Sequence, residues 1–264
     1  MLILSVFPGI DLFGRAFEAE GFCVVRGPDL IWGGDVRRFH PPAGVFVGVI
    51  GGPPCQDFSS LRRGQPSGEG VELLAEFARV VMEARPVWFL MENVPRVPGL
   101  SVPGYAVQRI DLRGGECGLS QRRLRHFQFG TVTARSLAVP RVVTEAETQP
   151  AAVASEGKRR GKRDWLAFCA LQGVPPLELP GMSRGAKYQA VGNGVPVPMG
   201  RLLARAIRAW MDADDGPRVC CCGCARPVRG KQQTAGPACR KRLERRRRQA
   251  GVTALGVAPP AGSR

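Results

Sequence analysis

The stretch GGPPCQDFSS, residues 51–60, sets a cysteine among prolines, glycines and small polar residues. Prolines and glycines exclude a regular helix or strand at this point, so Cys55 is expected in a loop and not in a packed core. A second chemical group, Glu92, directly follows the apolar run VWFLM at residues 87–91. A thiol and a carboxyl group, each after a strand-like run, can serve as nucleophile and proton donor. A loop cysteine without a role is the competing interpretation.

Histidine is scarce in this chain, and this narrows the chemistry. A thiol nucleophile usually depends on a histidine base, but the only candidates are His40, in the loop RRFHPPAG, and His126, after a basic cluster. A surface or phosphate contact is the expected role of His126. A Cys–His protease is therefore poorly supported. A thiolate paired with a carboxylic acid suits conjugate addition to an electron-poor ring whose nitrogen is protonated.

Three short apolar runs, at residues 2–6, 45–50 and 87–91, each end in residues rich in glycine or proline. Such runs are typical of strands buried on both faces of a parallel sheet. Helical patterns lie between them at residues 11–21 and 71–84, and this alternation predicts a doubly wound α/β sheet. Ligands of such sheets bind beyond the carboxyl ends of the strands. Gly9, Cys55 and Glu92 are all expected there.

The later part of the chain is less regular. No clear pattern is present over residues 131–160, and a helix is predicted over 164–175. Residues 185–211 predict a turn-rich loop that leads into a strongly amphipathic helix. After this helix the composition changes abruptly, which predicts a domain boundary near residue 212.

Charge and cysteine content restrict the partners. The chain of 264 residues carries a net charge of +16, and residues 216–264 supply +11 of it, with twelve Lys/Arg and one acidic residue. A basic tail on a mildly basic body favours nucleic acid over a membrane, although a solvated disordered tail would have the same composition. Nine cysteines without a signal peptide indicate free thiols in a reducing compartment. We expect a cytoplasmic, monomeric protein of a prokaryotic or phage-infected cell.

Five motifs, spread in order over roughly residues 1–211, resemble those of the DNA (cytosine-5) methyltransferase family. They are the Pro-Cys-Gln loop in 51–59, the Glu-Asn-Val motif in 91–95, the Gln-x-Arg-x-Arg motif in 118–130 and two late motifs, LQGVP at 171–175 and AVGNGVPVPM at 190–199. No one motif is decisive, but the ordered set is highly specific. The resemblance implies a Rossmann-like α/β core and methylation of cytosine in DNA, as in restriction–modification.

The resemblance also implies a mechanism. The thiolate of Cys55 would add to C6 of a flipped cytosine while Glu92 supplies a proton at N3, so that C5 attacks the methyl group of S-adenosylmethionine. Glu92 must then hold a proton near neutral pH, which requires burial. Arg123 and Arg125 would anchor the base and its phosphate and favour the thiolate.

The cofactor is expected over the first strand. Its predicted ligands are Phe7, Gly9 and Ile10 in the first loop, Asp29 for the ribose, Asp35 for the adenine amino group and Asn193 to close the pocket. The chain departs from the family's Phe-x-Gly-x-Gly pattern because Asp11 replaces the second glycine. Asp11 is interpreted either as a helix N-cap of little consequence or as a carboxylate that alters cofactor affinity.

A second departure concerns DNA recognition. The family reads sequence through a variable region that is very short here, at about residues 131–160, so specificity is either loose or assisted by another segment. The resemblance therefore implies four parts. They are a catalytic and cofactor-binding core (1–130), a reduced target-recognition region with the late-motif helix (131–180), a return to the core (181–211) and a basic Cys-rich tail (212–264).

The tail is the candidate for that assistance. Cys221, Cys224 and Cys239 have spacing that resembles part of a structural zinc site, but the usual fourth thiolate is missing. A disordered thiol-rich tail is an equal alternative. The arginine run 245–248 is expected to contact phosphates in either case.

Two other functions are compatible with these residues. One is methylation of RNA cytosine, since a relative in the family does so. The other is a catalytically idle DNA-binding protein, although such a descendant need not retain Cys55, Glu92, Arg123 and Arg125 together.

Overall fold

The computed structural model describes residues 1–58, 65, 67–142, 149–213, 218–219, 227–228, 234 and 236–254. The chain divides into two compact units, Met1–Trp210 and Met211–Arg264. In the described part of the chain, no helix is both long and apolar enough to cross a membrane.

The first unit is built on a six-stranded sheet with the order β2-β1-β3-β4-β7-β5 among the described residues. Its strands are β1 (Leu2–Val6), β2 (Cys23–Arg26), β3 (Gly48–Gly51), β4 (Trp88–Asn93), β5 (Ala106–Arg113) and β7 (Leu124–Thr131). β1 pairs in parallel with β2 and β3, and β3 with β4. The predicted parallel core is thus confirmed, with Rossmann-like strand order. β7, however, runs antiparallel to both β4 and β5.

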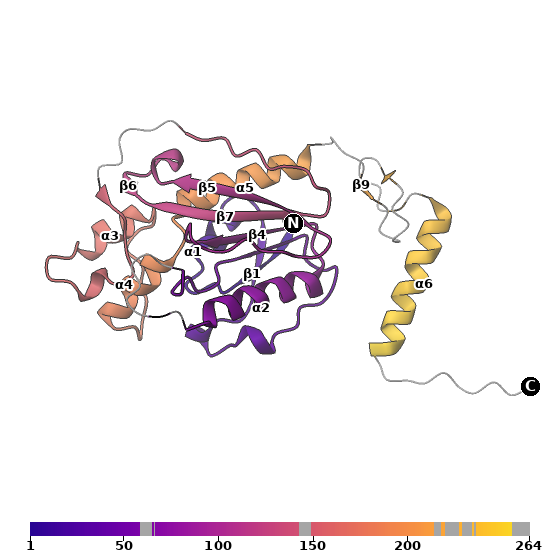
Figure 1. The fold of residues 1–264 in the computed structure, drawn as a ribbon, viewed down its shortest axis with the longest axis horizontal. Coiled ribbons are helices and arrows are strands. Elements are labelled where there is room, and N and C mark those ends of the chain that lie inside the picture. Colours follow the sequence, from indigo (N-terminus) through magenta and orange to yellow (C-terminus); the bar gives the residue numbers. More distant parts are fainter. Residues whose placement is uncertain are drawn as a thin grey trace, which may run out of the picture. The chain divides into compact units, whose positions relative to one another are not determined.

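Helices cover both faces of this sheet (Figure 1). α1 (Leu12–Glu18) and α5 (Val197–Asp212) lie on one face and α2 (Glu69–Ala84) on the other, whereas α3 (Trp165–Leu171) and α4 (Arg184–Asn193) lie beyond one end of the sheet. Neighbouring residues of β4 point to opposite faces. Trp88 stacks on Phe17 of α1, with ring centroids 6.1 Å apart, whereas Phe89 contacts Phe77 of α2 at 6.0 Å. The two faces therefore bury separate sets of aromatic side chains.

Short elements complete the first unit. They are the 3₁₀ helices η1 (Leu30–Trp32), η2 (Val36–Arg38), η3 (Gly115–Cys117) and η4 (Glu156–Lys158), and the two-residue strands β6 (Gln121–Arg122) and β8 (Gln149–Pro150). β6 and β8 pair in parallel, so the segment after residue 148 returns to the Gln-x-Arg-x-Arg motif. The second unit contains β9 (Arg218–Val219), β10 (Pro227–Val228) and α6 (Pro237–Ala254).

Residues 185–193 differ from the prediction of a turn-rich loop, because most of this segment is the helix α4. Ser183 caps α4 by accepting a hydrogen bond from the backbone N–H of Ala186 at 3.3 Å. Tyr188 and Val191 pack into a second hydrophobic cluster with Phe168 of α3. This burial outweighs the low helix propensity of the glycines, from which the loop was predicted.

Candidate active site

One cavity of about 340 Å³ opens in the first unit, where the carboxyl ends of β1, β3 and β4 meet. Its lining comes from the segments 5–13, 28–31, 34–37, 51–56 and 189–195, except residues 191 and 192, together with Leu73, Glu92 and Arg125. The cavity therefore collects loops that are far apart in the sequence, at the edge of the sheet where the strand pattern predicted a ligand. Its volume is in the range of ligand pockets.

The loop that carries Cys55 is tied to the end of the neighbouring strand. Asn93, the last residue of β4, donates from its side-chain amide to the carbonyl oxygen of Pro53 at 3.0 Å. The backbone N–H of Phe58 donates to the carbonyl oxygen of Cys55 at 3.0 Å, which makes a tight turn after the cysteine. Cys55 lines the cavity and is partly buried. A loop rich in glycine and proline thus obtains its order from contacts with its surroundings.

Glu92 and Arg125 form an ion pair inside the cavity wall. Nε of Arg125 lies 2.8 Å from Oε1 of Glu92, and Glu92 is only 8 % exposed. The strand register makes this contact possible, because Glu92 of β4 is opposite Phe127 of β7, and Arg125 lies two residues away on the same face. A Cβ at Gly52 would lie 3.1 Å from Oε2 of Glu92, so the cysteine loop passes close to this carboxyl group.

The pKa values of Glu92 and Cys55 are both raised. Burial raises the pKa of Glu92, and the charges of Arg125 and Arg123 oppose the rise. Burial, followed by the negative charge of Glu92, raises the pKa of the Cys55 thiol, against Arg125 and Arg123. The two groups therefore titrate as a coupled pair. A protonated Glu92 removes the repulsion that disfavours the Cys55 thiolate.

Arg123, predicted to contact substrate together with Arg125, has different surroundings. It is 2 % exposed and is absent from the cavity lining, which consists of described residues. Its guanidinium donates to the backbone carbonyl of Ala152 at 2.5 Å and to those of Gly192 and Gly194 at 2.9 and 3.1 Å. These bonds join the residue before β7 to the segment after β8 and to the C-terminal end of α4. The geometry gives Arg123 a positioning role through backbone carbonyls.

Two glutamines complete this buried polar centre. Gln121 donates to the carbonyl oxygen of Leu171 and accepts from the backbone N–H of Ala152 at 3.1 Å. Gln172 donates to the carbonyl oxygen of Val191 at 2.7 Å, and also bonds to Gln121 at 3.0 Å. The glutamines of the Gln-x-Arg and Leu-Gln-Gly motifs therefore bond to each other and to backbone groups near Ala152 and Val191.

The part of the cavity where the cofactor is predicted is organised by hydrogen bonds to backbone groups. One carboxylate oxygen of Asp29 accepts from the N–H of Gly9 at 2.8 Å, and the other from the N–H of Ile31 at 2.9 Å. The indole N–H of Trp32 donates to the carbonyl oxygen of Gly9 at 2.8 Å. Gly9 has φ +55°, and an added Cβ would meet only Ile31, at 3.9 Å. The site therefore combines an open backbone with a carboxylate that retains free lone pairs.

The remaining predicted cofactor residues also line the cavity. They are Phe7, Ile10, Asp35 and Asn193. Phe7 has φ +55°, a conformation that is rare for a bulky residue, directly before the turn at Gly9. Asn193 is the last residue of α4 and is exposed at the cavity. The roles of these side chains toward a cofactor remain predictions.

Asp11 occupies the left-handed conformation, with φ +57°, that the family's second glycine would adopt without strain. Its carboxylate accepts from the N–H of Gly14 and from the Ser5 hydroxyl, each at 2.9 Å, and lies 2.8 Å from Nε of Arg26. Burial raises its pKa. The interpretation of Asp11 as an N-cap is thus confirmed, and its carboxylate is directed to protein partners.

Neither histidine lines the cavity, whose lining consists of described residues. Nδ1 of His40 contacts Glu83 of α2 at 3.0 Å. His126 is buried, and its Nδ1 lies 2.8 Å from Asp111. The prediction of a surface or phosphate contact for His126 is therefore wrong. The pairing of β7 with β5 places this side chain beside Asp111, where it is buried.

The predicted zinc ligands cannot be compared as a set, because Cys221 and Cys224 lie outside the described residues. Cys239 is buried in the second unit, on α6. Within the part of the chain that the structure describes, no three His, Cys, Asp or Glu residues gather as a metal site. The zinc site stays a prediction.

Several residues that organise the cavity were missed by sequence reasoning. Trp32, Asn93, Gln121 and Gln172 all act through backbone groups of distant segments. Only their places inside or beside motifs distinguish them in the sequence, since a bond between a side chain and a remote carbonyl leaves no periodic pattern.

The chain is similar to proteins of known family. Residues 34–159 match the family model described as C-5 cytosine-specific DNA methylase. Relatives include the type II methyltransferases M.HgiDI of Herpetosiphon aurantiacus, 36% identical over 31% of this chain and 30% of the relative, and M.AgeI of Thalassovita gelatinovora, 31% identical over 61% and 44%. The matched segments span less than half of the length of these two relatives.

Solved structures agree on the fold. A putative DNA modification methyltransferase from a prophage of E. coli superposes with a TM-score of 0.54 at 14% identity. The Dnmt2 methyltransferase of S. pombe superposes with a TM-score of 0.56 at 11% identity. Both alignments cover 80% of this chain and 99% of the other. The family match over residues 34–159, the relatives and the shared fold make the chain similar to C-5 cytosine-specific DNA methylases.

Proposed function

We propose that this protein is a DNA cytosine C5-methyltransferase that uses S-adenosylmethionine. The observation that carries the proposal is the single cavity in which Cys55, Glu92 and Arg125 meet the loops of Gly9 and Asp29. A nucleophile, a buried acid and a candidate cofactor site in one enclosure are the components that methylation of an unreactive ring carbon requires.

Cys55 would act as the nucleophile. Its sulfur forms a bond to C6 of cytosine while Glu92 gives or shares its proton with N3, and the electron pair displaced from the C5–C6 double bond makes C5 nucleophilic. Arg125 holds the Glu92 carboxyl group in place through the 2.8 Å ion pair. Methyl transfer would leave S-adenosylhomocysteine. Loss of the C5 proton to solvent, return of the N3 proton to Glu92 and expulsion of the Cys55 thiolate would then restore the aromatic ring and the free enzyme.

The cavity fits the cofactor. The open backbone at Gly9, the Asp29 carboxylate and the apolar neighbours Leu30 and Ile31 suit a nucleoside with a ribose to hold. Leu30, Ile31 and Trp32 are 67 %, 49 % and 64 % exposed, so three neighbouring apolar side chains are accessible here. S-Adenosylmethionine, when bound, supplies an electrophilic methyl group. Asp35 and Asn193 would bound the same space.

Double-stranded DNA is the proposed partner, with the target base extruded from the helix because a stacked base is inaccessible. Exposed cations on the turn around η4, Lys158, Arg159 and Arg160, support this partner. η4 contacts α4, whose residues Gln189 and Asn193 line the cavity. These cations therefore lie on a turn that packs against a helix of the cavity lining, within the proposed target-recognition region.

The second unit would add affinity for DNA. Seven of the nine residues 240–248, in α6, are Lys or Arg. Cations of this density favour the phosphate backbone and carry no sequence information. A structural zinc ion bound by Cys221, Cys224 and Cys239 remains part of this proposal. The zinc content of the unaltered protein and of the Cys239→Ser variant tests it, and we expect the variant to lose the metal.

Transfer of labelled methyl groups tests the proposed function. We expect transfer from methyl-labelled S-adenosylmethionine to duplex DNA, and none to RNA of the same sequence. A duplex with 5-fluorocytosine should become covalently trapped on the protein, because the fluorine blocks loss of the C5 substituent. The Cys55→Ser variant serves as the control that cannot be trapped. Labelled RNA with unlabelled DNA would instead assign an RNA substrate, and no transfer or trapping across varied sequence contexts would overturn the enzymatic proposal.

A further inference from the structure

Asp35 is held by a residue of its own turn. It caps η2, where its Oδ1 accepts from the backbone N–H of Arg37 at 3.0 Å. Nη1 of Arg37 lies 3.5 Å from both carboxylate oxygens. Both Asp35 and Arg37 line the cavity. The backbone N–H fixes one oxygen of Asp35, and the guanidinium attracts the carboxylate as a whole.

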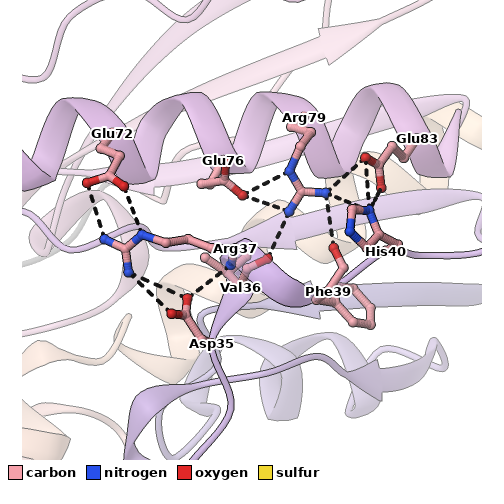
Figure 2. Close-up of polar contacts among 9 residues, drawn as sticks. All are labelled: Asp35, Val36, Arg37, Phe39, His40, Glu72, Glu76, Arg79 and Glu83. Carbon is pink, nitrogen blue, oxygen red and sulfur yellow. Dashed lines mark hydrogen bonds and ion pairs between the residues drawn. The ribbon is translucent and has the colours of Figure 1, made fainter.

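The opposite edge of the same guanidinium is fastened to α2. Nε of Arg37 donates to Oε1 of Glu72 at 2.9 Å, and Nη2 donates to Oε2 at 3.3 Å, so that the pair is bidentate (Figure 2). Glu69 lies 3.6 Å from Nη2. A two-point contact fixes the plane of the guanidinium, and with it the direction from which Asp35 is approached.

A second arginine, Arg79, binds the backbone of this turn (Figure 2). Arg79 of α2 donates to the carbonyl oxygens of Val36 at 2.8 Å and Phe39 at 3.0 Å. Its own position is set by Glu76 and Glu83, at 2.7 and 2.9 Å. Arg79 therefore anchors η2 on α2 through bonds that do not involve Arg37.

We propose that Arg37 is a positioning residue for cofactor binding, which transmits the fixed geometry of α2 to the carboxylate of Asp35. The inference rests on the proposed function, in which Asp35 receives the exocyclic amino group of the adenine. An oriented acceptor binds this group better than a carboxylate that samples several rotamers, because the ordering cost is met before binding.

The contacts of Arg37 should depend on salt concentration and not on pH. Arginine remains charged throughout the working pH range, so pH should not open the contact, whereas salt should weaken it because Arg37 and Glu72 are partly exposed, at 33 % and 57 % of their side chains. Dissociation constants measured at low and high salt therefore report on the contact separately from the titration of Cys55 and Glu92.

Calorimetric binding of S-adenosylhomocysteine to the full chain tests the proposal. We expect Arg37→Gln to weaken binding about tenfold, with the melting temperature within about 2 °C of the unaltered protein. Arg38→Gln, at the exposed neighbouring position of the same turn, is the matched control and should bind within about twofold. In methyl transfer, the KM for the donor should rise in Arg37→Gln while kcat at saturation is retained.

A charge swap separates orientation of Asp35 from simple attachment of the loop. The double variant Arg37→Glu with Glu72→Arg can restore an ion pair between η2 and α2, but it places a carboxylate beside Asp35. We expect no recovery of affinity. Recovery, or unchanged affinity in Arg37→Gln, would overturn the proposal. Failure of the unaltered chain to bind would instead refute the cofactor assignment, and normal binding by Asp35→Ala, which removes the acceptor, would refute the role of Asp35 in it.

Discussion

The two ends of the cavity hold carboxylates in opposite ways. At the reactive end, Glu92 is 8 % exposed and its partner is the side chain of Arg125. At the cofactor end, Asp29 is partly exposed and its oxygens accept from the backbone N–H groups of Gly9 and Ile31. Burial alters the acidity of a group, whereas backbone hydrogen bonds fix its position. The difference matches proton transfer at one end and recognition at the other.

Replacement of the nucleophile should have the largest effect. We expect Cys55→Ser to lower methyl transfer by about 1,000-fold or more, because an alcohol at neutral pH is a far weaker nucleophile than a thiolate. Binding of S-adenosylhomocysteine should change by less than about twofold, since Cys55 is not among the predicted cofactor ligands. Cys23→Ser, at an exposed position of β2, is the control. Equal loss of binding and transfer in Cys55→Ser would mean that the two ends are not separable.

Glu92→Gln should lower transfer by about 100- to 1,000-fold, because the amide cannot give a proton to N3. The variant also tests the coupled titration. Without the charge of Glu92, the pKa of Cys55 should fall, so that the pH profile of Cys55 alkylation moves to lower pH. An unshifted profile would show that Glu92 does not control the thiol.

Glu92→Gln should also change how the stability of the protein depends on pH. The pKa of Glu92 is raised in the folded state, so its contribution to stability is complete below the unfolded pKa and is lost as the pH rises through the folded value. The melting temperature of Glu92→Gln relative to the unaltered protein should therefore increase from pH 5 to pH 8. A difference that decreases with pH would contradict the raised pKa.

The two arginines of the Gln-x-Arg-x-Arg motif should respond differently. Arg123→Met would leave the carbonyls of Ala152, Gly192 and Gly194 without donors, and we expect a loss of about 3 kcal/mol in the free energy of unfolding. Arg125→Met should change that free energy by about 1 kcal/mol or less and should lower methyl transfer instead. Denaturant unfolding measures the first effect and labelled transfer the second. If Arg123→Met instead lowered methyl transfer and left the free energy of unfolding unchanged, Arg123 would be assigned to substrate binding.

Asp29→Asn should have the smallest effect of this series. The amide can replace one acceptor but not both, so the N–H of either Gly9 or Ile31 loses its partner. We expect binding of S-adenosylhomocysteine to weaken about tenfold, with kcat at saturation within about twofold of the unaltered protein. A large decrease in kcat at saturation would show that the cofactor end also serves the chemical step.

The amino-acid sequence alone determined the local elements and the sites that follow them. The apolar runs predicted β1, β3 and β4, and the apolar stripe of 71–84 predicted α2. Asp11 was predicted as a cap from its place before a helix. These features depend on neighbours within a few residues, so a pattern of period 2 or 3.6 and a capping side chain suffice. The cavity at Cys55 and Glu92 followed, because parallel strands end at one edge of a sheet.

Only the tertiary structure decided that Arg123 and Arg125, two residues apart, have different partners. Arg123 and Arg125 are equivalent in the motif, but the pairing of β7 with β4 directs Arg125 to Glu92, whereas Arg123 turns to three carbonyls of distant segments. The antiparallel direction of β7, the helical state of α4 and the contact of Arg37 with Glu72 are of the same kind. Each depends on partners between about ten and seventy residues away, and the free energy of such contacts exists only after the chain has folded.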